Sequence, residues 1–188
     1  MFQVRVHGRG GQGVVTTAEL LSVAAFAEGR HAQAFPSFGS ERTGAPVVAF
    51  CRIDDRPIRV REPIDRPDAV IVQDATLLGQ VDVFGGLAED GYVLVNTARP
   101  LAALGLPGHA IAVPATGLAI AGIGRPLPGA ALLGGFAALT GRIGLQSVLT
   151  AIRERFPEQL GERNVAIAQQ AFVLVSGNRR ELTRAQAD

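Results

Sequence analysis

The residues from Gly8 to Gly13 carry the first pattern with chemical meaning, because Gly-Arg-Gly-Gly-Gln-Gly matches the phosphate-binding spacing G-x-G-x-x-G. Glycines let the backbone turn sharply and approach a ligand closely. Unpaired N–H groups at the start of a following helix attract an anion. The candidate binding residues in this segment are Arg9, Gly10, Gly11, Gln12 and Gly13. We expect Gly10 and Gly11 to be needed for the backbone geometry of the turn.

Three interpretations of this glycine-rich turn stay open. A dinucleotide-binding fold needs an acidic residue at the end of its second strand to hold the ribose. Residues 29–38 contain no carboxylate, and the next one is Glu41, so NAD binding lacks its second anchor. The turn is otherwise a structural turn that requires glycine, or a contact for an anion or cofactor phosphate that a partner chain completes.

Few other residues are candidates for chemistry. Asp74 and Asn96 follow predicted parallel strands, at the edge where open α/β sheets bind ligands. His7 fits a histidine at a strand end with satisfied hydrogen bonds, rather than a base. The single cysteine, Cys51, lies in an apolar segment and excludes a cysteine-ligated cluster within this chain. No side chains pair as a nucleophile and its base, so we predict neither a catalytic residue nor a metal site.

The glycine-rich turn must be held between a strand and a helix. Phe2 to His7 alternates apolar and polar residues, as in a half-buried strand, and Val14 to Glu28 has helical apolar spacing. Three later apolar runs are typical of buried strands: Ala69–Val72, Tyr92–Val95 and Ala110–Val113. Because helix-sized segments separate the strands, we predict a mainly parallel sheet.

A loop-rich stretch, residues 34–46, precedes a predicted β-hairpin. The apolar segments Val47–Ile53 and Ile58–Val60 flank the turn signal at residues 54–57. The last third has helical spacing, with helices expected to end near Thr140, at Pro157 and at Gly177-Asn178.

These elements predict an α/β fold. It has a mainly parallel sheet flanked by helices, a Rossmann-like opening of strand, glycine turn and helix, a β-hairpin insertion and a helical C-terminal third. We expect residues 1–178 to form a single domain and residues 179–188 a charged C-terminal tail.

The composition limits the possible classes of protein. The chain has 188 residues, of which 47% are hydrophobic and 19% charged, and its formal net charge is +1. These values indicate one folded domain rather than a disordered chain, and the balanced charge argues against nucleic acid. No apolar run of 18 residues and no signal sequence is found, so we expect no membrane span and a cytoplasmic location. The apolar surplus favours a surface that a partner covers.

Longer motifs surround the glycine-rich turn. The first runs from His7 through Gly13 and continues in Gln33–Gly39, Glu41-Arg42, Gly44–Pro46 and Arg52–Asp55. A second group comprises Gly124–Pro128, Leu133–Phe136 and Ile152–Phe156. Together these motifs cover roughly residues 4–175 and resemble the gamma subunit of the pyruvate and related 2-oxoacid:ferredoxin oxidoreductases.

This resemblance implies a subunit of an enzyme that carries out CoA-acylating oxidative decarboxylation of a 2-oxoacid. The enzyme would contain alpha, beta and ferredoxin-like delta subunits and use thiamine diphosphate, Mg²⁺, iron–sulfur clusters and coenzyme A. None of these cofactors is expected on this chain alone, which would help to form the coenzyme A cleft and the subunit interface. Arg9 and Arg42 become candidate contacts for coenzyme A or a partner chain.

One position departs from the pattern of the family. Relatives often carry Pro-Asn-x-x-Met-Leu-Gly, whereas Gly129 and Leu132 stand here at the Asn and Met positions. Two other functions stay open: a stand-alone nucleotide- or CoA-binding module, and a purely structural subunit.

Overall fold

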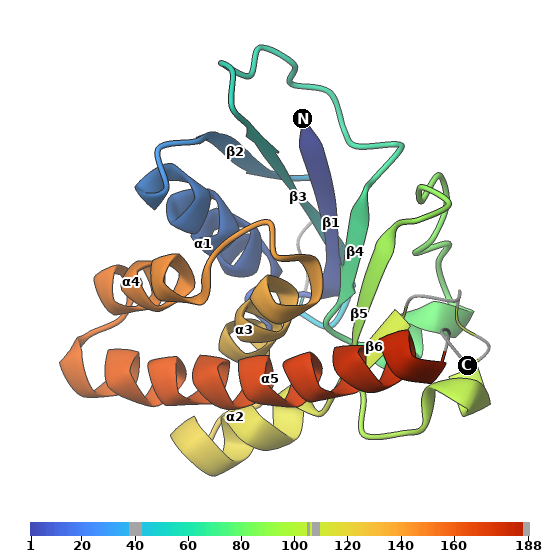
Figure 1. Ribbon diagram of the computed structural model, residues 1–188, viewed down its shortest axis with the longest axis vertical. Helices are drawn as coiled ribbons and strands as arrows, with labels where there is room; N and C mark the ends of the chain where they lie inside the picture. Colours follow the sequence, from blue (N-terminus) through green and yellow to red (C-terminus); the bar gives the residue numbers. More distant parts are fainter. Residues whose placement is uncertain (38–42, 105, 107–109, 186–188) are drawn as a thin grey trace.

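Six strands form a single sheet in this chain, whose computed structural model describes residues 1–37, 43–104, 106 and 110–185. The strands are β1 (Phe2–Arg9), β2 (His31–Pro36), β3 (Pro46–Asp54), β4 (Ala69–Val72), β5 (Tyr92–Asn96) and β6 (Ala110–Val113). Their order across the sheet is β2-β3-β1-β4-β5-β6 (Figure 1). Strands β1, β4, β5 and β6 are parallel to one another, and β3 is antiparallel to both of its neighbours. The predicted α/β fold with a mainly parallel sheet is confirmed.

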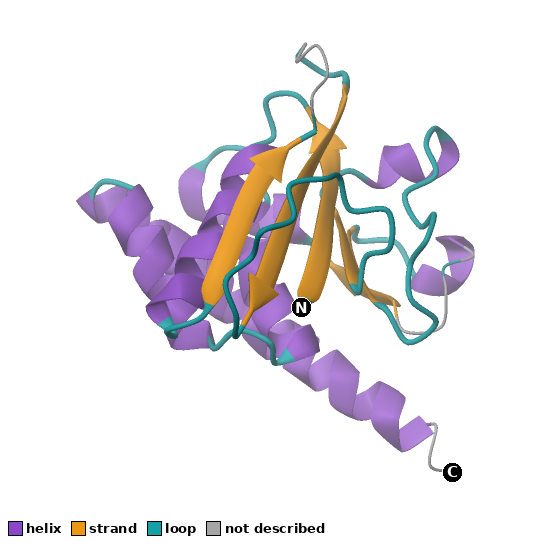
Figure 2. Cartoon of the chain, turned by 90° about the horizontal axis from the view of Figure 1, so that it is seen from above, coloured by secondary structure: helices purple, strands orange, loops and turns teal. Residues whose placement is uncertain are grey.

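Helices cover one face of this sheet. They are α1 (Val14–Ala27), α2 (Ala115–Ile123), α3 (Gly129–Thr140), α4 (Leu145–Arg155) and α5 (Glu158–Ala185), with short 3-10 helices at Ala75–Gly79 and Leu101–Leu104. Figure 2 shows the long helices gathered behind the strands. Alternate residues of β1, such as Val4 and Val6, join Leu21 of α1 and Phe136 of α3 in the core. No helix within the described ranges is both long and apolar enough to cross a membrane.

Coil segments cover much of the opposite face, and two buried arginines tie them down. Arg5 on β1 donates to the carbonyl groups of Val83 at 3.0 Å and Gly85 at 2.7 Å. Arg52 on β3 donates to the carbonyl group of Glu62 at 2.5 Å. Several carbonyl groups per side chain are within reach because a guanidinium group has five N–H donors. These arginine hydrogen bonds thus hold the coil on this face together with a second apolar cluster that includes Val70, Val93 and Val83.

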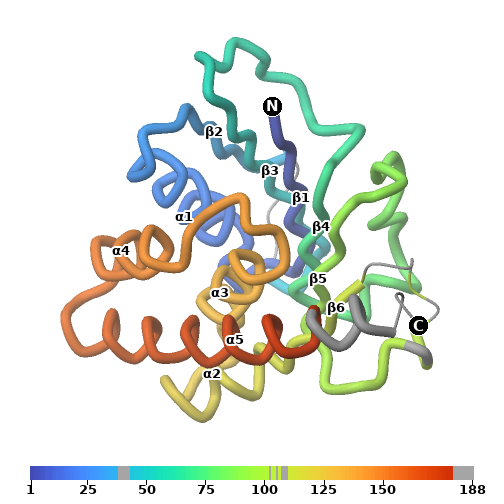
Figure 3. Tube along the Cα trace, viewed as in Figure 1, coloured from blue at the N-terminus to red at the C-terminus, as the bar shows by residue number. Residues whose placement is uncertain are grey.

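The predicted hairpin is wrong in its second strand. Ile58–Val60 is coil, and the antiparallel partners of β3 are instead β1 and β2; residues 34–36 of β2 fall in the stretch predicted to be loop-rich. The chain after β3 leaves the sheet at Asp54 and crosses to the start of β4 (Figure 3). Both edges of β3 are already paired, with β1 and β2, so this crossing segment has no edge of β3 to join, and the Arg52 contact holds it against the sheet face.

The C-terminal third is helical, as predicted, with two differences. Helix α5 passes the predicted stop at Gly177-Asn178 and continues to Ala185, so residue 178 lies inside a helix. A glycine inside a helix costs only about 1 kcal/mol, which a long packed helix tolerates. Helix α2 was not predicted, because its nine residues are almost all apolar and show no alternation of apolar and polar faces. The single domain over residues 1–178 stays a prediction.

His7 makes the fold sensitive to acid. Neither ring nitrogen has a hydrogen-bond partner among the described residues, so the satisfied hydrogen bonds predicted from the sequence are not found there. Burial, reinforced by the charge of Arg5 and opposed by Asp82, lowers the pKa of His7 from 6.5 to about 4. The unfolded chain therefore gains its proton at a higher pH than the folded chain, and stability falls as the pH drops through this interval.

We expect the free energy of unfolding to fall by up to about 3 kcal/mol between pH 7 and pH 4, because His7 is protonated more readily in the unfolded chain. Urea unfolding of the chain across this range measures the effect, and His7→Gln, which cannot titrate, is the reference. A pH dependence that is equally steep in the variant would contradict this account.

Candidate functional site

The glycine-rich turn, Gly8–Gly13, joins β1 to α1. A Cβ at Gly8 would lie 2.6 Å from Cγ2 of Val14, so the turn packs too closely there for any other residue. Gly11 and Gly13 have left-handed backbones, with φ of 92° and 73°. Open space surrounds the Cβ position of both, so the backbone conformation alone favours glycine.

Gly10 pairs with a neighbouring loop through its backbone; these contacts do not require glycine, so its expected need for glycine stays a prediction. Its backbone is not left-handed; its N–H donates to the carbonyl group of Ala45 at 2.9 Å, and its own carbonyl accepts from the Gly44 N–H at 3.1 Å. The glycine-rich turn is therefore paired with the loop that precedes β3.

The N-terminus of α1 is open toward solvent. Gly13 is the N-cap and lacks a side chain, and the first turn holds no acidic residue. The first N–H groups of a helix have no intrahelical acceptor and carry partial positive charge. Together with the left-handed glycines just before them, they form an arrangement that suits an anion.

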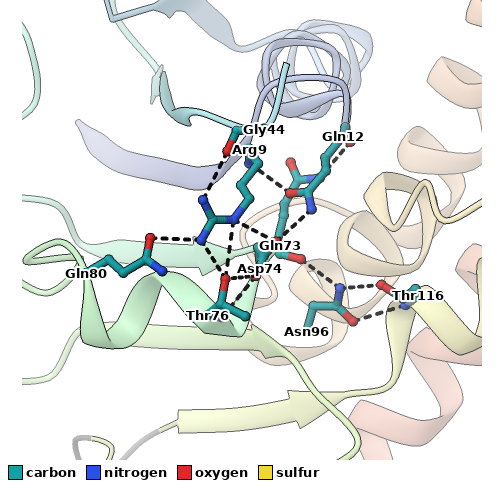
Figure 4. Close-up of polar contacts among 9 residues, drawn as sticks. All are labelled: Arg9, Gln12, Gly44, Gln73, Asp74, Thr76, Gln80, Asn96 and Thr116. Carbon is teal, nitrogen blue, oxygen red and sulfur yellow. Dashed lines mark hydrogen bonds and ion pairs between the residues drawn. The ribbon is translucent and has the colours of Figure 1, made fainter. Parts of the chain in front are cut away.

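Arg9 is engaged within the chain. Its Nη1 donates to the carbonyl group of Gly44 at 3.0 Å, and its Nη2 donates to Thr76 Oγ1 at 2.7 Å and Gln80 Oε1 at 2.9 Å. Its Nε lies 3.2 Å from Asp74 Oδ2 (Figure 4). The sequence predicted the Arg9 guanidinium group as a phosphate contact. In the structure it instead holds the glycine-rich turn against the segment after β4.

Hydrogen bonds hold both the side-chain amide and the backbone carbonyl group of Gln12. Its Oε1 accepts from the Arg9 backbone N–H at 2.8 Å, and its Nε2 donates to Asp74 Oδ2 at 2.9 Å. Its carbonyl group accepts from Gln73 Nε2 at 3.1 Å. The side chain therefore braces the turn, while its outer surface lines the cavity described below.

The polar contacts continue across the carboxyl ends of the parallel strands. Asn96, at the end of β5, donates from Nδ2 to the carbonyl group of Gln73 at 2.8 Å and to Thr116 Oγ1 at 2.7 Å. Its Oδ1 accepts from the Thr116 N–H at 3.0 Å, which satisfies a donor in the first turn of α2 (Figure 4). Asp74 and Asn96, predicted as candidates at this edge, hold neighbouring chain segments together.

A cavity of about 370 Å³ lies beside the glycine-rich turn. This volume is within the range of small-molecule sites. Its walls are largely apolar, with Leu20, Ile123, Leu127, Phe156 and Leu160 among them. Polar groups come from Gln12, Thr16, Arg125 and Asn164. The cavity therefore combines an apolar interior with donors at the start of α1.

Two features make this cavity electropositive. Gly129, the first residue of α3, lines it, and α3 like α1 begins without a capping side chain or an acidic residue in its first turn. Arg125 also lines it and is exposed, and its side chain makes no hydrogen bond or ion pair with any described residue. In the sequence, Arg125 is part of a family motif, and no local pattern marks it as a binding residue.

The remaining sequence candidates lie elsewhere. Arg42 is outside the described residues. Cys51 is fully buried in β3, and burial raises the pKa of its thiol to about 12. Within the described part of the chain, no three His, Cys, Asp or Glu side chains gather as they would around a metal ion.

Comparison with known proteins points to one family. The sequence pattern of the family described as pyruvate ferredoxin/flavodoxin oxidoreductase matches residues 3–174. The common gamma subunit of the pyruvate/ketoisovalerate oxidoreductases of Thermococcus kodakarensis is 49% identical over 177 residues, which cover 92% of this chain and 96% of that protein.

Solved structures agree with this match. The crystal structure of the pyruvate oxidoreductase subunit PORC of Thermotoga maritima superimposes with a TM-score of 0.81 at 35% identity, covering 91% of this chain and 94% of that chain. The fold also recurs in the 2-oxoglutarate:ferredoxin oxidoreductase of Magnetococcus marinus, with a TM-score of 0.73 at 13% identity. That match covers 94% of this chain but 31% of the longer chain.

Proposed function

The chain belongs to the pyruvate ferredoxin/flavodoxin oxidoreductase family as the gamma subunit of a pyruvate or related 2-oxoacid ferredoxin oxidoreductase, and from this premise we propose that it forms part of the coenzyme A site. The cavity beside the uncapped start of α1 is the observation that carries the proposal. The Magnetococcus marinus enzyme, which shares the fold, was solved with 2-oxoglutarate, coenzyme A and succinyl-CoA bound.

The chemistry of coenzyme A matches the two parts of this site. Its phosphate groups are anions, which suit the N–H groups of Gly13 and of the first turn of α1. Arg125 supplies a cation without a partner among the described residues, and a guanidinium group binds phosphate through charge-assisted hydrogen bonds. The pantetheine arm is long and largely uncharged, which suits the apolar walls formed by residues such as Leu127 and Phe156.

In this proposal, the chain binds and orients coenzyme A while the partner subunits carry out the redox steps. The overall reaction joins the acyl group of a 2-oxoacid to the coenzyme A thiol, releases carbon dioxide and passes two electrons to ferredoxin. Alpha, beta and delta subunits would hold thiamine diphosphate, Mg²⁺ and the iron–sulfur clusters. The single, fully buried and protonated Cys51 thiol does not suit cluster ligation, which needs several thiolates.

The role of the other sequence candidates follows from their partners. Gly10, Gly11 and Gln12 shape the turn that presents the N–H groups, and Arg9 keeps the turn in place. Arg42 stays a predicted contact for coenzyme A or for a partner subunit.

Arg125→Ala tests the proposal. In the assembled enzyme, we expect the KM for coenzyme A to rise about 10-fold through the loss of one charge-assisted contact. The KM for the 2-oxoacid should stay unchanged, because thiamine diphosphate is assigned to other subunits. Steady-state kinetics with each substrate varied in turn give both values.

Arg163→Ala is the matched control, since Arg163 is an exposed arginine on α5 and does not line the cavity. Size-exclusion chromatography shows whether each variant still assembles. If the Arg125→Ala enzyme assembles and its coenzyme A kinetics are unchanged, the proposed site is contradicted. That result would favour the alternative of a purely structural subunit.

A further inference from the structure

Asp74 collects hydrogen bonds from two parts of the chain. Its Oδ1 accepts from the Thr76 N–H at 3.0 Å and from Thr76 Oγ1 at 2.6 Å, both local contacts. Its Oδ2 faces the glycine-rich turn, where it accepts from Gln12 Nε2 at 2.9 Å and lies 3.2 Å from Arg9 Nε. One carboxylate thus connects the end of β4 to the turn after β1.

The contacts of Asp74 Oδ2 with Gln12 and Arg9 hold the residues next to the proposed binding site. Gln12 immediately precedes Gly13, the N-cap of α1, and both residues line the cavity. Asp74 itself does not line the cavity. The chain of contacts from Asp74 to the cavity therefore runs through Gln12, which Arg9 also contacts through its backbone N–H.

We propose that Asp74 is a positioning residue, which holds Gln12 and Arg9 through Oδ2 and so fixes the direction of the N–H groups at the start of α1. This inference rests on the proposed function, because it assumes that coenzyme A binds at those groups. The residue touches neither the ligand nor any reacting atom.

A carboxylate is the group that these contacts require. Oδ2 accepts from Gln12 Nε2 and faces Arg9 Nε, while Oδ1 accepts from the Thr76 N–H, so an asparagine in either orientation would set its NH₂ group against an N–H donor. Partial burial raises the pKa of Asp74, but the hydrogen bonds from Thr76 and Gln12 and the Arg9 charge together hold it below its usual value. Asp74 is therefore ionised at neutral pH.

The first experiment replaces Asp74 in the enzyme assembled with its partner subunits. For Asp74→Asn, we expect the KM for coenzyme A to rise about 10-fold. The KM for the 2-oxoacid and kcat at saturating coenzyme A should stay within about 2-fold, because the chemical step is assigned to other subunits. Asp68→Asn is the matched control: Asp68 Oδ2 also accepts a backbone N–H, from Gln3 at 2.7 Å, but at the opposite end of the sheet.

The second experiment is a double-mutant cycle between residues 74 and 12. Gln12→Met keeps a side chain of similar volume but removes the amide that donates to Asp74. We expect Asp74→Asn to raise the KM for coenzyme A much less in the Gln12→Met background than in the original enzyme, because the two changes remove the same hydrogen bond. Residue 74 serving only as a general support for the fold would give additive effects instead.

Asp74→Ser covers the case in which Asp74→Asn does not assemble. Serine is a good N-cap and can still accept from the Thr76 N–H, but it is too short to reach Gln12. We expect the same rise in the KM for coenzyme A.

Two results would overturn the inference. One is an unchanged KM for coenzyme A in the Asp74 variants while Arg125→Ala raises it. The other is an effect of Asp74→Asn on the KM that is equally large in the Gln12→Met background, which would show that Asp74 does not act through Gln12. Unchanged kinetics in both the Asp74 and the Arg125 variants would instead refute the proposed coenzyme A site.

Discussion

Replacing Gly134 by alanine should lower the free energy of unfolding by about 3 kcal/mol or more. Gly134 lies in α3, whose residues are buried from Ala130 to Thr140. A Cβ at this position would collide with the carbonyl group of Ala168 in α5 and lie 2.8 Å from its Cα. Both obstacles are backbone atoms of a helix, so only a shift of α3 against α5 could relieve the clash.

Gly117→Ala is the control for this substitution. Gly117 lies inside α2, and no atom stands within 4 Å of its Cβ position. Alanine should stabilise the chain there by about 0.5–1 kcal/mol, because it has the higher helix propensity. Chemical denaturation of both variants gives the comparison. Equal stability of the two would mean that α3 and α5 do not pack as described.

Arg52→Ala should cost a similar amount, about 3 kcal/mol or more. The Arg52 side chain is 2% exposed, and its guanidinium group lies 5.2 Å from the centre of the Phe35 ring. It donates to Gln3 Oε1 at 3.2 Å and to the carbonyl group of Glu62 at 2.5 Å. Alanine would leave a cavity, and it would leave these acceptors without their donor.

Arg52→Met separates the two costs, because methionine fills most of the space but donates no hydrogen bond. We expect it to be less destabilising than alanine by about 1–2 kcal/mol, the part that depends on volume. Arg56→Ala, in the exposed turn after β3, should change stability by no more than about 0.5 kcal/mol. If Arg52→Ala were equally harmless, the coil over this face of the sheet would not depend on Arg52.

The parallel core of the fold was predictable because its signals are local. The strands at 69–72, 92–95 and 110–113 are continuous apolar runs, since both faces of each are buried, including those of β6 at the edge of the sheet. The hairpin was predicted wrongly because Ile58–Val60 has a strand-like composition, and nothing nearby in sequence shows that Arg52 ties the neighbouring carbonyl groups to the sheet face. The end of α5 was placed too early because Gly177 weakens a helix without always ending it.

The candidate site, too, was predictable from the sequence only where its signals are local. Its glycine-rich turn was visible in the sequence, since a strand, closely spaced glycines and a helix each leave a local pattern. The partners of Arg9 were not, because Asp74, Thr76 and Gln80 are more than 60 residues away and meet it only where β1 pairs with β4. Arg125 became a candidate only when α1, α3 and the segment after α2 were seen to enclose one cavity.

The family, the order of most elements and the position of the glycine-rich turn were predictable from the sequence, because they depend on residue types at short spacing. Which polar side chains are free to bind a ligand depends instead on the tertiary structure. A guanidinium group binds whichever acceptors surround it, and strand pairing and helix packing choose those acceptors. For this reason Arg9 holds the turn in place, while Arg125 stands open at the cavity.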